Sequence, residues 1–147
     1  MRSNGKYILG IDPGRAKCGL ALVYHSAGGC QKLYGKVIAV SQLEEELRQL
    51  LAQWPLEKVV LGDGTGKKAI FQRLNNFFSS KIEINYVDER NSSLEARRRY
   101  WQEKPARGIW RLIPTSMRVP PEPYDEYVAL ILIERYLEAR KKCEEEP

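Results

Sequence analysis

The order of short apolar segments along the chain limits its fold more than any other feature. Three segments follow one another closely at the beginning, and two more are each preceded by the apolar stripe of a helix. The five segments cover residues 7–11, 20–24, 33–40, 58–61 and 82–87. Their length and apolarity are typical of strands. Closely linked strands favour an antiparallel meander, whereas strands alternating with helices require crossover connections. The sequence therefore predicts an α/β fold with a mixed five-stranded sheet flanked by helices.

Four helices are predicted from apolar residues that recur at intervals of three and four positions. They are expected to begin at Ser41, to follow a stripe over residues 70–78, to begin at Ser92, and to cover residues 124–142. After each of the two serines a glutamate follows three positions later, which is the spacing of a capping box. A long basic connection rich in proline, residues 103–123, precedes the last helix. The length fits one domain over residues 1–147.

The composition excludes several classes of protein. No apolar run approaches the roughly 18–20 residues of a membrane span, and the first apolar stretch is too short for a secretory signal. We therefore expect a cytoplasmic location and no membrane partner. The three cysteines are scattered without CxxC spacing, which argues against a disulfide framework or a zinc site. His25 is the single histidine, so chemistry that needs several imidazoles is excluded. The formal charge of +5 permits a polyanionic partner.

Acidic residues stand where predicted strands end. Asp12 ends the first strand, Asp63 follows the fourth and Glu89 follows the fifth, while Asp125 begins the last helix. Since the carboxyl ends of parallel strands meet at one edge of a sheet, these acids are expected to lie together. Oxygen ligands suit Mg²⁺ or Mn²⁺, and a pair of such ions supports phosphodiester cleavage. Taken singly, each acid has an alternative interpretation as a turn residue, a helix cap or an exposed charge.

Two basic regions favour contacts with phosphate groups. Lys67 and Lys68 follow a glycine-rich loop that matches neither the P-loop nor the dinucleotide fingerprint, although a helix N-terminus beside two lysines can hold a phosphate. Residues 97–118 carry six arginines and one lysine against one glutamate, which suits phosphate contact and base stacking. The alternative interpretation places Tyr100 and Trp101 in the core and the arginines on a solvated face. The candidate nucleic-acid contacts are Lys17, Lys67, Lys68, Arg90, Arg97, Arg98, Arg107, Arg111 and Arg118.

Residues 8–14, 87–96 and 125–132 form three segments that resemble motifs of the YqgF/RuvX family of nucleases with the RNase H fold. Residues 8–14, Ile-Leu-Gly-Ile-Asp-Pro-Gly, resemble the family's opening strand and turn, and the resemblance continues over residues 17–21. Residues 87–96 resemble its DERxTTxEA motif, with serines in place of the threonines. Residues 125–132 resemble its last-helix motif, an Asp followed by small and apolar residues. The three motifs occur in the family's order, and the resemblance extends over nearly the whole chain.

The resemblance implies an RNase H-like fold and a nuclease dependent on Mg²⁺ or Mn²⁺. It implies Asp12, Glu89 and Asp125 as the metal-binding catalytic carboxylates. The chain departs from the family at residues 62–66, where Gly-Asp-Gly-Thr-Gly replaces a turn of Gly-Leu-Pro type. The related RuvC resolvases carry a glutamate there, so Asp63 is a candidate fourth ligand, and the second catalytic acid is either Asp63 or Glu89. The long basic connection resembles a divergent branch of the family.

Family members are associated with maturation of the 5′ end of small-subunit ribosomal RNA and were earlier described as Holliday junction resolvases. We therefore expect a two-metal-ion nuclease that acts on structured RNA, as a monomer or a homodimer. Two alternatives stay open: a DNA junction resolvase, which requires paired active sites, and a non-catalytic nucleic-acid-binding module of the same fold. An ATPase of the actin or sugar-kinase type also begins with a strand and a glycine-rich turn. Such an ATPase closes a nucleotide between two domains of this type, whereas 147 residues are expected to provide one, so this interpretation ranks last.

Overall fold

The computed structural model describes residues 5–104, 108–114, 120 and 123–145, and the structural statements below concern these residues. The strands are β1 (Lys6–Asp12), β2 (Lys17–Ser26), β3 (Gly29–Ala39), β4 (Leu56–Gly62) and β5 (Glu83–Val87). The helices are α1 (Leu43–Gln53), α2 (Lys67–Phe78), α3 (Ser92–Glu103) and α4 (Asp125–Glu145), with the short 3₁₀ helices η1 (Val40–Gln42) and η2 (Gly108–Leu112). Every predicted strand and α-helix is present in its expected region.

The strands form one mixed sheet in the order β3-β2-β1-β4-β5. The first three strands pair antiparallel, because their connections are short turns. β4 joins β1, and β5 joins β4, in parallel, because a helix carries the chain back each time. The parallel strands β1, β4 and β5 therefore end at the same edge of the sheet. The mixed five-stranded sheet predicted from the sequence is confirmed.

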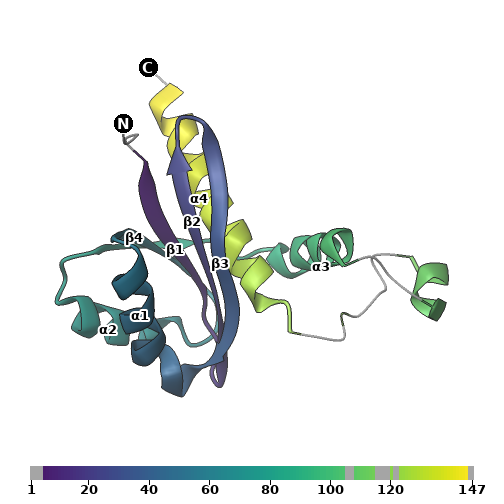
Figure 1. Cartoon of the computed structure of the whole chain (residues 1–147), viewed down its shortest axis with the longest axis horizontal. Coiled ribbons are helices and arrows are strands. Elements are labelled where there is room, and N and C mark those ends of the chain that lie inside the picture. Colours follow the sequence, from purple (N-terminus) through teal and green to yellow (C-terminus); the bar gives the residue numbers. More distant parts are fainter. Residues whose placement is uncertain (1–4, 105–107, 115–119, 121–122, 146–147) are drawn as a thin grey trace.

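Helices cover both faces of the sheet (Figure 1). On one face, α1 and α2 pack through residues such as Leu47 and Leu74. On the other face, α3 and α4 pack through residues such as Tyr100 and Ile133. The α4 backbone comes close to the centre of the sheet because Gly10 lacks a side chain: a Cβ there would lie 2.5 Å from the carbonyl oxygen of Ala129. The central strands β1, β2 and β4 are thereby largely buried between two pairs of helices, whereas most of β3 stays partly or fully exposed.

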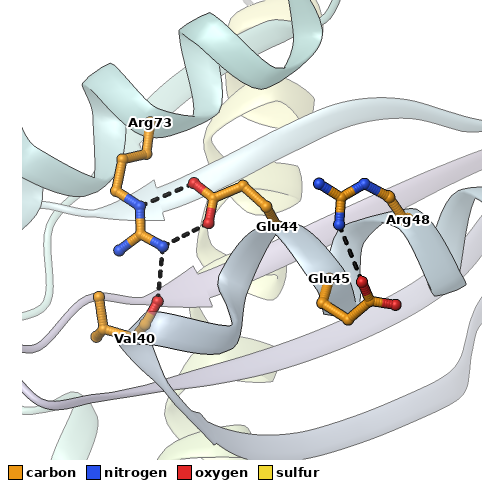
Figure 2. Close-up of polar contacts among 5 residues, drawn as sticks. All are labelled: Val40, Glu44, Glu45, Arg48 and Arg73. Carbon is orange, nitrogen blue, oxygen red and sulfur yellow. Dashed lines mark hydrogen bonds and ion pairs between the residues drawn. The ribbon is translucent and has the colours of Figure 1, made fainter.

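The predicted capping box at Ser41 is wrong. The chain first forms η1, so that α1 begins at Leu43 with no side-chain cap on its N-terminus. A side chain of α2 holds this end instead: Arg73 donates a hydrogen bond of 2.8 Å to the carbonyl oxygen of Val40 and a bond of 2.8 Å from Nε to Glu44 (Figure 2). The first turn of α1 is therefore fixed by a contact between helices, which the local spacing of residues does not reveal.

The predicted capping box at Ser92 is also wrong. Asn91, with a left-handed φ of 61°, is the residue that precedes α3, and Ser92 is the first helical residue. The Ser92 N–H donates a hydrogen bond of 2.9 Å to the carbonyl oxygen of Glu89. The chain thus turns directly after Glu89, and this turn moves Ser92 past the cap position.

The basic region expected over residues 103–123 is divided between different structures. Its start belongs to the end of α3, and η2 lies within it. Tyr100 and Trp101 on α3 are 2% and 8% exposed, so they are core residues, as the alternative interpretation had it. Arg107 and Arg118 lie outside the described residues. The described helices include none that is long and apolar enough to span a membrane.

Candidate nuclease site at the edge of the sheet

The acid that ends β1 and the start of α4 meet at the edge where the parallel strands finish. Asp12 is the last residue of β1 and pairs across the sheet with Gly19 of β2. A Cβ on Gly19 would collide with the backbone carbonyl and the Cβ of Asp125. The missing side chain at Gly19 therefore allows the first turn of α4 to lie beside Asp12.

The side chain of Glu89, two positions beyond β5, lies over the loop that follows β4. A Cβ at Gly62 or Gly64 would collide with the oxygens of the Glu89 carboxyl. The Glu89 N–H donates a hydrogen bond of 3.2 Å to Asp63 Oδ1, and the Asp63 N–H donates one of 3.1 Å to the carbonyl oxygen of Val87. The loops after β4 and β5 are thereby joined, and two glycines provide the space for the carboxyl of Glu89.

Asp12 and Glu89 are in direct contact, and their charges disfavour each other. Burial raises the pKa of Asp12 to about 9, together with a hydrogen bond to Glu89 and the negative charges of Glu89 and Asp125. Burial also raises the pKa of Glu89, and the nearby charges of Asp63 and Asp88 add to that effect, against the hydrogen bond from Asp12. In the absence of a cation, the pair retains a proton that Asp12 donates to Glu89.

Asp63 occupies a different position from the other three acids. It is exposed, and its carboxylate accepts the amide hydrogen of Glu89. Asp12 makes its contact with Glu89. On this geometry Glu89, rather than Asp63, is the acid that faces Asp12, and Asp63 supports the backbone that presents it.

The chemistry of these side chains fits a divalent cation. The Oε1 atom of Glu89 is buried and has no hydrogen-bond partner among the described residues, which is costly for a carboxylate oxygen unless a cation or a proton satisfies it. The candidate metal ligands here are all carboxylate oxygens, the type of ligand that Mg²⁺ and Mn²⁺ prefer. In the described part of the chain, no three acidic, histidine or cysteine side chains converge into a complete ligand set. Asp12 and Glu89 therefore form a partial site, with Asp125 beside it.

Several residues that the sequence predicts to contact phosphate lie around this edge of the sheet. Gly66, with a φ of 83°, packs against the carbonyl oxygen of Gly14, so the α2 N-terminus lies against the turn that follows Asp12. That N-terminus carries Lys67, whose Nζ lies 5.5 Å from the centre of the Tyr86 ring. Exposed Lys17 at the start of β2, exposed Arg90 after β5 and half-buried Arg97 on α3 lie at or near the same edge. Together with Lys67 and Lys68 they form the basic rim.

Arg97 connects the basic rim to the start of α4. Its Nε donates a hydrogen bond of 3.1 Å to the hydroxyl of Tyr124, the residue before Asp125. Arg98 is exposed on α3. Arg111 belongs to η2, which lies beyond the end of α3 and away from the sheet (Figure 1). Arg111 is therefore separated from the acids, whereas Arg97 is close to them.

Two kinds of residue important for this geometry were not identified from the sequence. Gly62 and Gly64 were visible as a glycine-rich loop, but their role is to make room for a carboxyl group rather than to hold a phosphate. Nothing in the sequence pattern indicated a role for Arg135. From α4 it donates hydrogen bonds of 2.9 Å to the carbonyl oxygen of Asp88 and of 3.0 Å to the Glu95 carboxylate. This contact anchors the loop that carries Glu89 to α4.

Comparisons with known proteins give a fold and no family. No family model and no curated protein match the chain. RuvC of Thermus thermophilus, in complex with a Holliday junction substrate, superposes with a TM-score of 0.58 at 18% identity, over 92% of this chain and 96% of that one. The fowlpox virus Holliday junction resolvase superposes with a TM-score of 0.61 at 13% identity, over 91% and 99%. The structure of the fowlpox virus resolvase in complex with Holliday junction DNA superposes with a TM-score of 0.62 at 14% identity, over 91% of this chain and 98% of that one. The chain has the RNase H-like fold of these resolvases, as expected from the sequence.

Proposed function

We propose that this protein is a divalent-cation-dependent nuclease that hydrolyses phosphodiester bonds of structured nucleic acid. The observation that carries the proposal is the contact between Asp12 and Glu89 at the ends of parallel strands, with a buried carboxylate oxygen that lacks a partner. The fold shared with Holliday junction resolvases supports it. Fold alone does not define activity, so the proposal rests on the site.

Asp12, Glu89 and Asp125 would hold the cations, in a two-ion arrangement. Bound Mg²⁺ or Mn²⁺ supplies a water of lowered pKa and neutralises charge on the phosphate. The chain's own residues then have distinct tasks. Gly62 and Gly64 leave the space in which the Glu89 carboxyl is held, and Asp63 fixes the Glu89 backbone.

The basic rim would bind the backbone of the substrate. Lys67 and Lys68 stand at the α2 N-terminus, where free N–H groups and lysines suit a phosphate. Arg97 would contact a phosphate near Asp125. Contacts of this kind give register rather than sequence specificity, which suits a substrate recognised by its structure.

For the substrate, we favour structured RNA, and specifically maturation of the 5′ end of small-subunit ribosomal RNA in the cytoplasm. The resemblance of residues 8–14, 87–96 and 125–132 to YqgF/RuvX motifs supports this choice. The second candidate is a Holliday junction resolvase acting as a dimer. Its support is the similarity to resolvase structures over about nine-tenths of the chain.

A cleavage panel tests both candidates. Labelled precursor ribosomal RNA, single-stranded RNA and a four-way DNA junction are incubated with the protein in Mg²⁺ and then in Mn²⁺. We expect Asp12→Asn to lower cleavage by about 100-fold or more while binding persists. Asp88→Asn is the matched control, since this exposed neighbour of Glu89 makes its hydrogen bond to the Arg90 N–H, which asparagine can also accept.

The outcomes separate the alternatives. Cleavage of RNA supports the first candidate, and cleavage of the junction by a dimer supports the second. Asp12→Asn protein that cleaves at the wild-type rate would remove Asp12 from the site. Binding without any cleavage in either metal would instead indicate a non-catalytic binding module.

A further inference from the structure

A cavity of about 420 Å³ lies at the end of the sheet opposite to the acids. Its walls come from the first residues of β1 and β4, the turn of the β2–β3 hairpin and the last turns of α4. The start of β1, this hairpin turn and the end of α4 lie at the same end of the molecule (Figure 1). Lys6 and Asp12 are the two ends of β1, so the cavity is on the order of 20 Å from the proposed catalytic edge.

The lining of this cavity is strongly cationic. Four cations, Lys6, Lys58, Arg140 and Lys141, face a single carboxylate, Glu138, among its described lining residues. Basic residues in the last turns of a helix also complement the helix dipole, which accounts for cations on α4. It does not account for Lys6 or Lys58, which come from two strands.

Lys58 is the informative member of the group. This β4 residue is only 8% exposed, although burial of an ammonium group is costly without partners. Its Nζ donates a hydrogen bond of 2.7 Å to the hydroxyl of Tyr136 and lies 3.5 Å from Glu83. The Glu83 side chain is 60% exposed, so water screens this ion pair. Lys58 therefore places its side-chain nitrogen in the wall of a cavity whose described lining includes one carboxylate.

Tyr136 adds a second polar group to the same wall. Its hydroxyl oxygen accepts hydrogen bonds from Lys58 at 2.7 Å and from Arg140 at 3.3 Å. A hydroxyl oxygen has two acceptor positions and one hydrogen to donate. Both acceptor positions are used by cations, which leaves the hydroxyl hydrogen for a further acceptor, and no such bond is present among the described residues.

We propose that this cavity binds a small phosphorylated anion, separately from the proposed nuclease site. Phosphate oxygens accept several hydrogen bonds at once, and here Lys6, Lys58, Arg140 and the Tyr136 hydroxyl surround one space. The volume lies in the range of small-molecule sites, about 300–1,000 Å³. The anion has the size of a pyrophosphate or a nucleotide, which the apolar side chains of Ile8 and Leu137 in the same wall also accommodate.

His25 allows a direct test, because it lines the cavity and is the only histidine of the chain. In tag-free protein with chelator present, inorganic pyrophosphate and adenosine diphosphate are titrated while the His25 ring signals are followed by NMR and the affinity is measured by calorimetry. A parallel titration uses a single-stranded oligonucleotide. We expect the His25 signals to shift with both small probes, and saturation to occur without divalent cations.

Substitutions at the exposed positions Lys6 and Arg140 avoid the risk that a Lys58 variant fails to fold. We expect Lys6→Gln and Arg140→Gln each to weaken the affinity for pyrophosphate about fivefold or more, and Tyr136→Phe to weaken it about threefold. Arg48→Gln removes one positive charge from α1, on the other face of the sheet, and should change the affinity less than twofold. The His25 spectrum of each unliganded variant reports whether the cavity is intact.

Two results would overturn the proposal. One is an unchanged His25 spectrum at millimolar pyrophosphate and adenosine diphosphate, or losses as large in Arg48→Gln as in Arg140→Gln. The other is binding of the oligonucleotide alone through Lys6 and Arg140. Because chelator removes the proposed nuclease activity, neither result depends on whether the protein cleaves nucleic acid.

Discussion

At the scale of single residues, Asp12 and Glu89 hold their carboxyl groups together in a half-buried position, and the cost of this contact is measurable without any substrate. Asparagine at position 12 keeps the size of the side chain, cannot ionise in the folded or the unfolded chain, and can donate a hydrogen bond to Glu89. We expect Asp12→Asn to stabilise the protein by about 1–3 kcal/mol in chelator at neutral pH. This corresponds to several degrees in Tm, measured by thermal unfolding.

Added divalent cation should reverse the order of the Tm values of the wild type and Asp12→Asn. Mg²⁺ or Mn²⁺ should raise the Tm of the wild type by mass action and that of Asp12→Asn much less. Asp88→Asn, at an exposed position next to Glu89, should behave as the wild type. If Asp12→Asn lowers the Tm in chelator, the two carboxyl groups do not repel each other as described.

The close approach of Gly64 to the Glu89 carboxyl leads to a second prediction at the scale of residues. A Cβ there would collide with Glu89 Oε2, so we expect Gly64→Ala to displace the carboxyl and to lower divalent-dependent cleavage about tenfold or more. Gly28→Ala is the matched control, because a Cβ in this hairpin turn would only approach Ser26 Oγ at 3.9 Å. Equal activities of the two variants would show that the position of Glu89 does not depend on Gly64.

The positions of the acids were predictable from the sequence, but the surroundings of the acids were not. Asp12 and Glu89 follow apolar strand segments, and this pattern is local. The choice between Glu89 and Asp63 depended on where each side chain turns, and the role of Gly64 depends on a residue 25 positions away. Contacts of this kind exist only after the sheet has assembled.

At the scale of elements, α1 and α2 are joined by Arg73 and Glu44 (Figure 2). The hydrogen bond from Arg73 is the main cause that holds the pKa of Glu44 below its ordinary value of 4.5. A carboxyl whose pKa is lowered by folding stabilises the protein above its unfolded pKa, and this stabilisation is lost as the pH falls through the folded value. The effect should therefore be complete at neutral pH and be lost in acid, as the pH falls below the ordinary value and through the lower folded value.

We expect Glu44→Gln to lower the free energy of unfolding by about 1 kcal/mol at pH 7, since the pair is about one-third exposed and partly screened. The difference from the wild type should vanish near pH 3. Glu45→Gln is the matched control, because Glu45 pairs with Arg48 in a contact that is more than half exposed. Denaturant unfolding at several pH values measures both variants, and a Glu44→Gln effect that persists at pH 3 would contradict the assignment to charge.

The elements themselves were well predicted, and so was the start of α3 at Ser92, whereas the start of α1 and the two capping boxes were not. Apolar periodicity located every α-helix, since it reports the face that packs on the sheet. Neither α1 nor α3 has the predicted side-chain cap, because Arg73 holds the first turn of α1 and the turn after Glu89 leads directly into α3. A capping motif of four residues is weak evidence when a side chain or turn from elsewhere can satisfy the same backbone groups.

At the scale of the whole molecule, charge is arranged around the sheet rather than spread evenly. The acids stand at one edge, the basic rim surrounds that edge, and the cationic cavity lies at the opposite end. For the proposed nuclease, this arrangement predicts that binding depends on salt through a few cations at the rim. Each phosphate contact contributes about 0.7–0.9 to the slope of log K against log salt concentration.

The two ends of α2 provide a matched comparison. Lys68 is exposed at its first turn beside the acids, and Lys81 is exposed just beyond its last residue. We expect Lys68→Gln to reduce the slope by about one and to weaken binding similarly for different sequences, because the contact is to phosphate. Lys81→Gln should leave the slope unchanged. The measurement is the affinity of Asp12→Asn protein for labelled RNA between 50 and 300 mM salt. Equal slopes for the two lysine variants would mean that the substrate does not cross the N-terminus of α2, and that the basic rim needs to be sought on α3 instead.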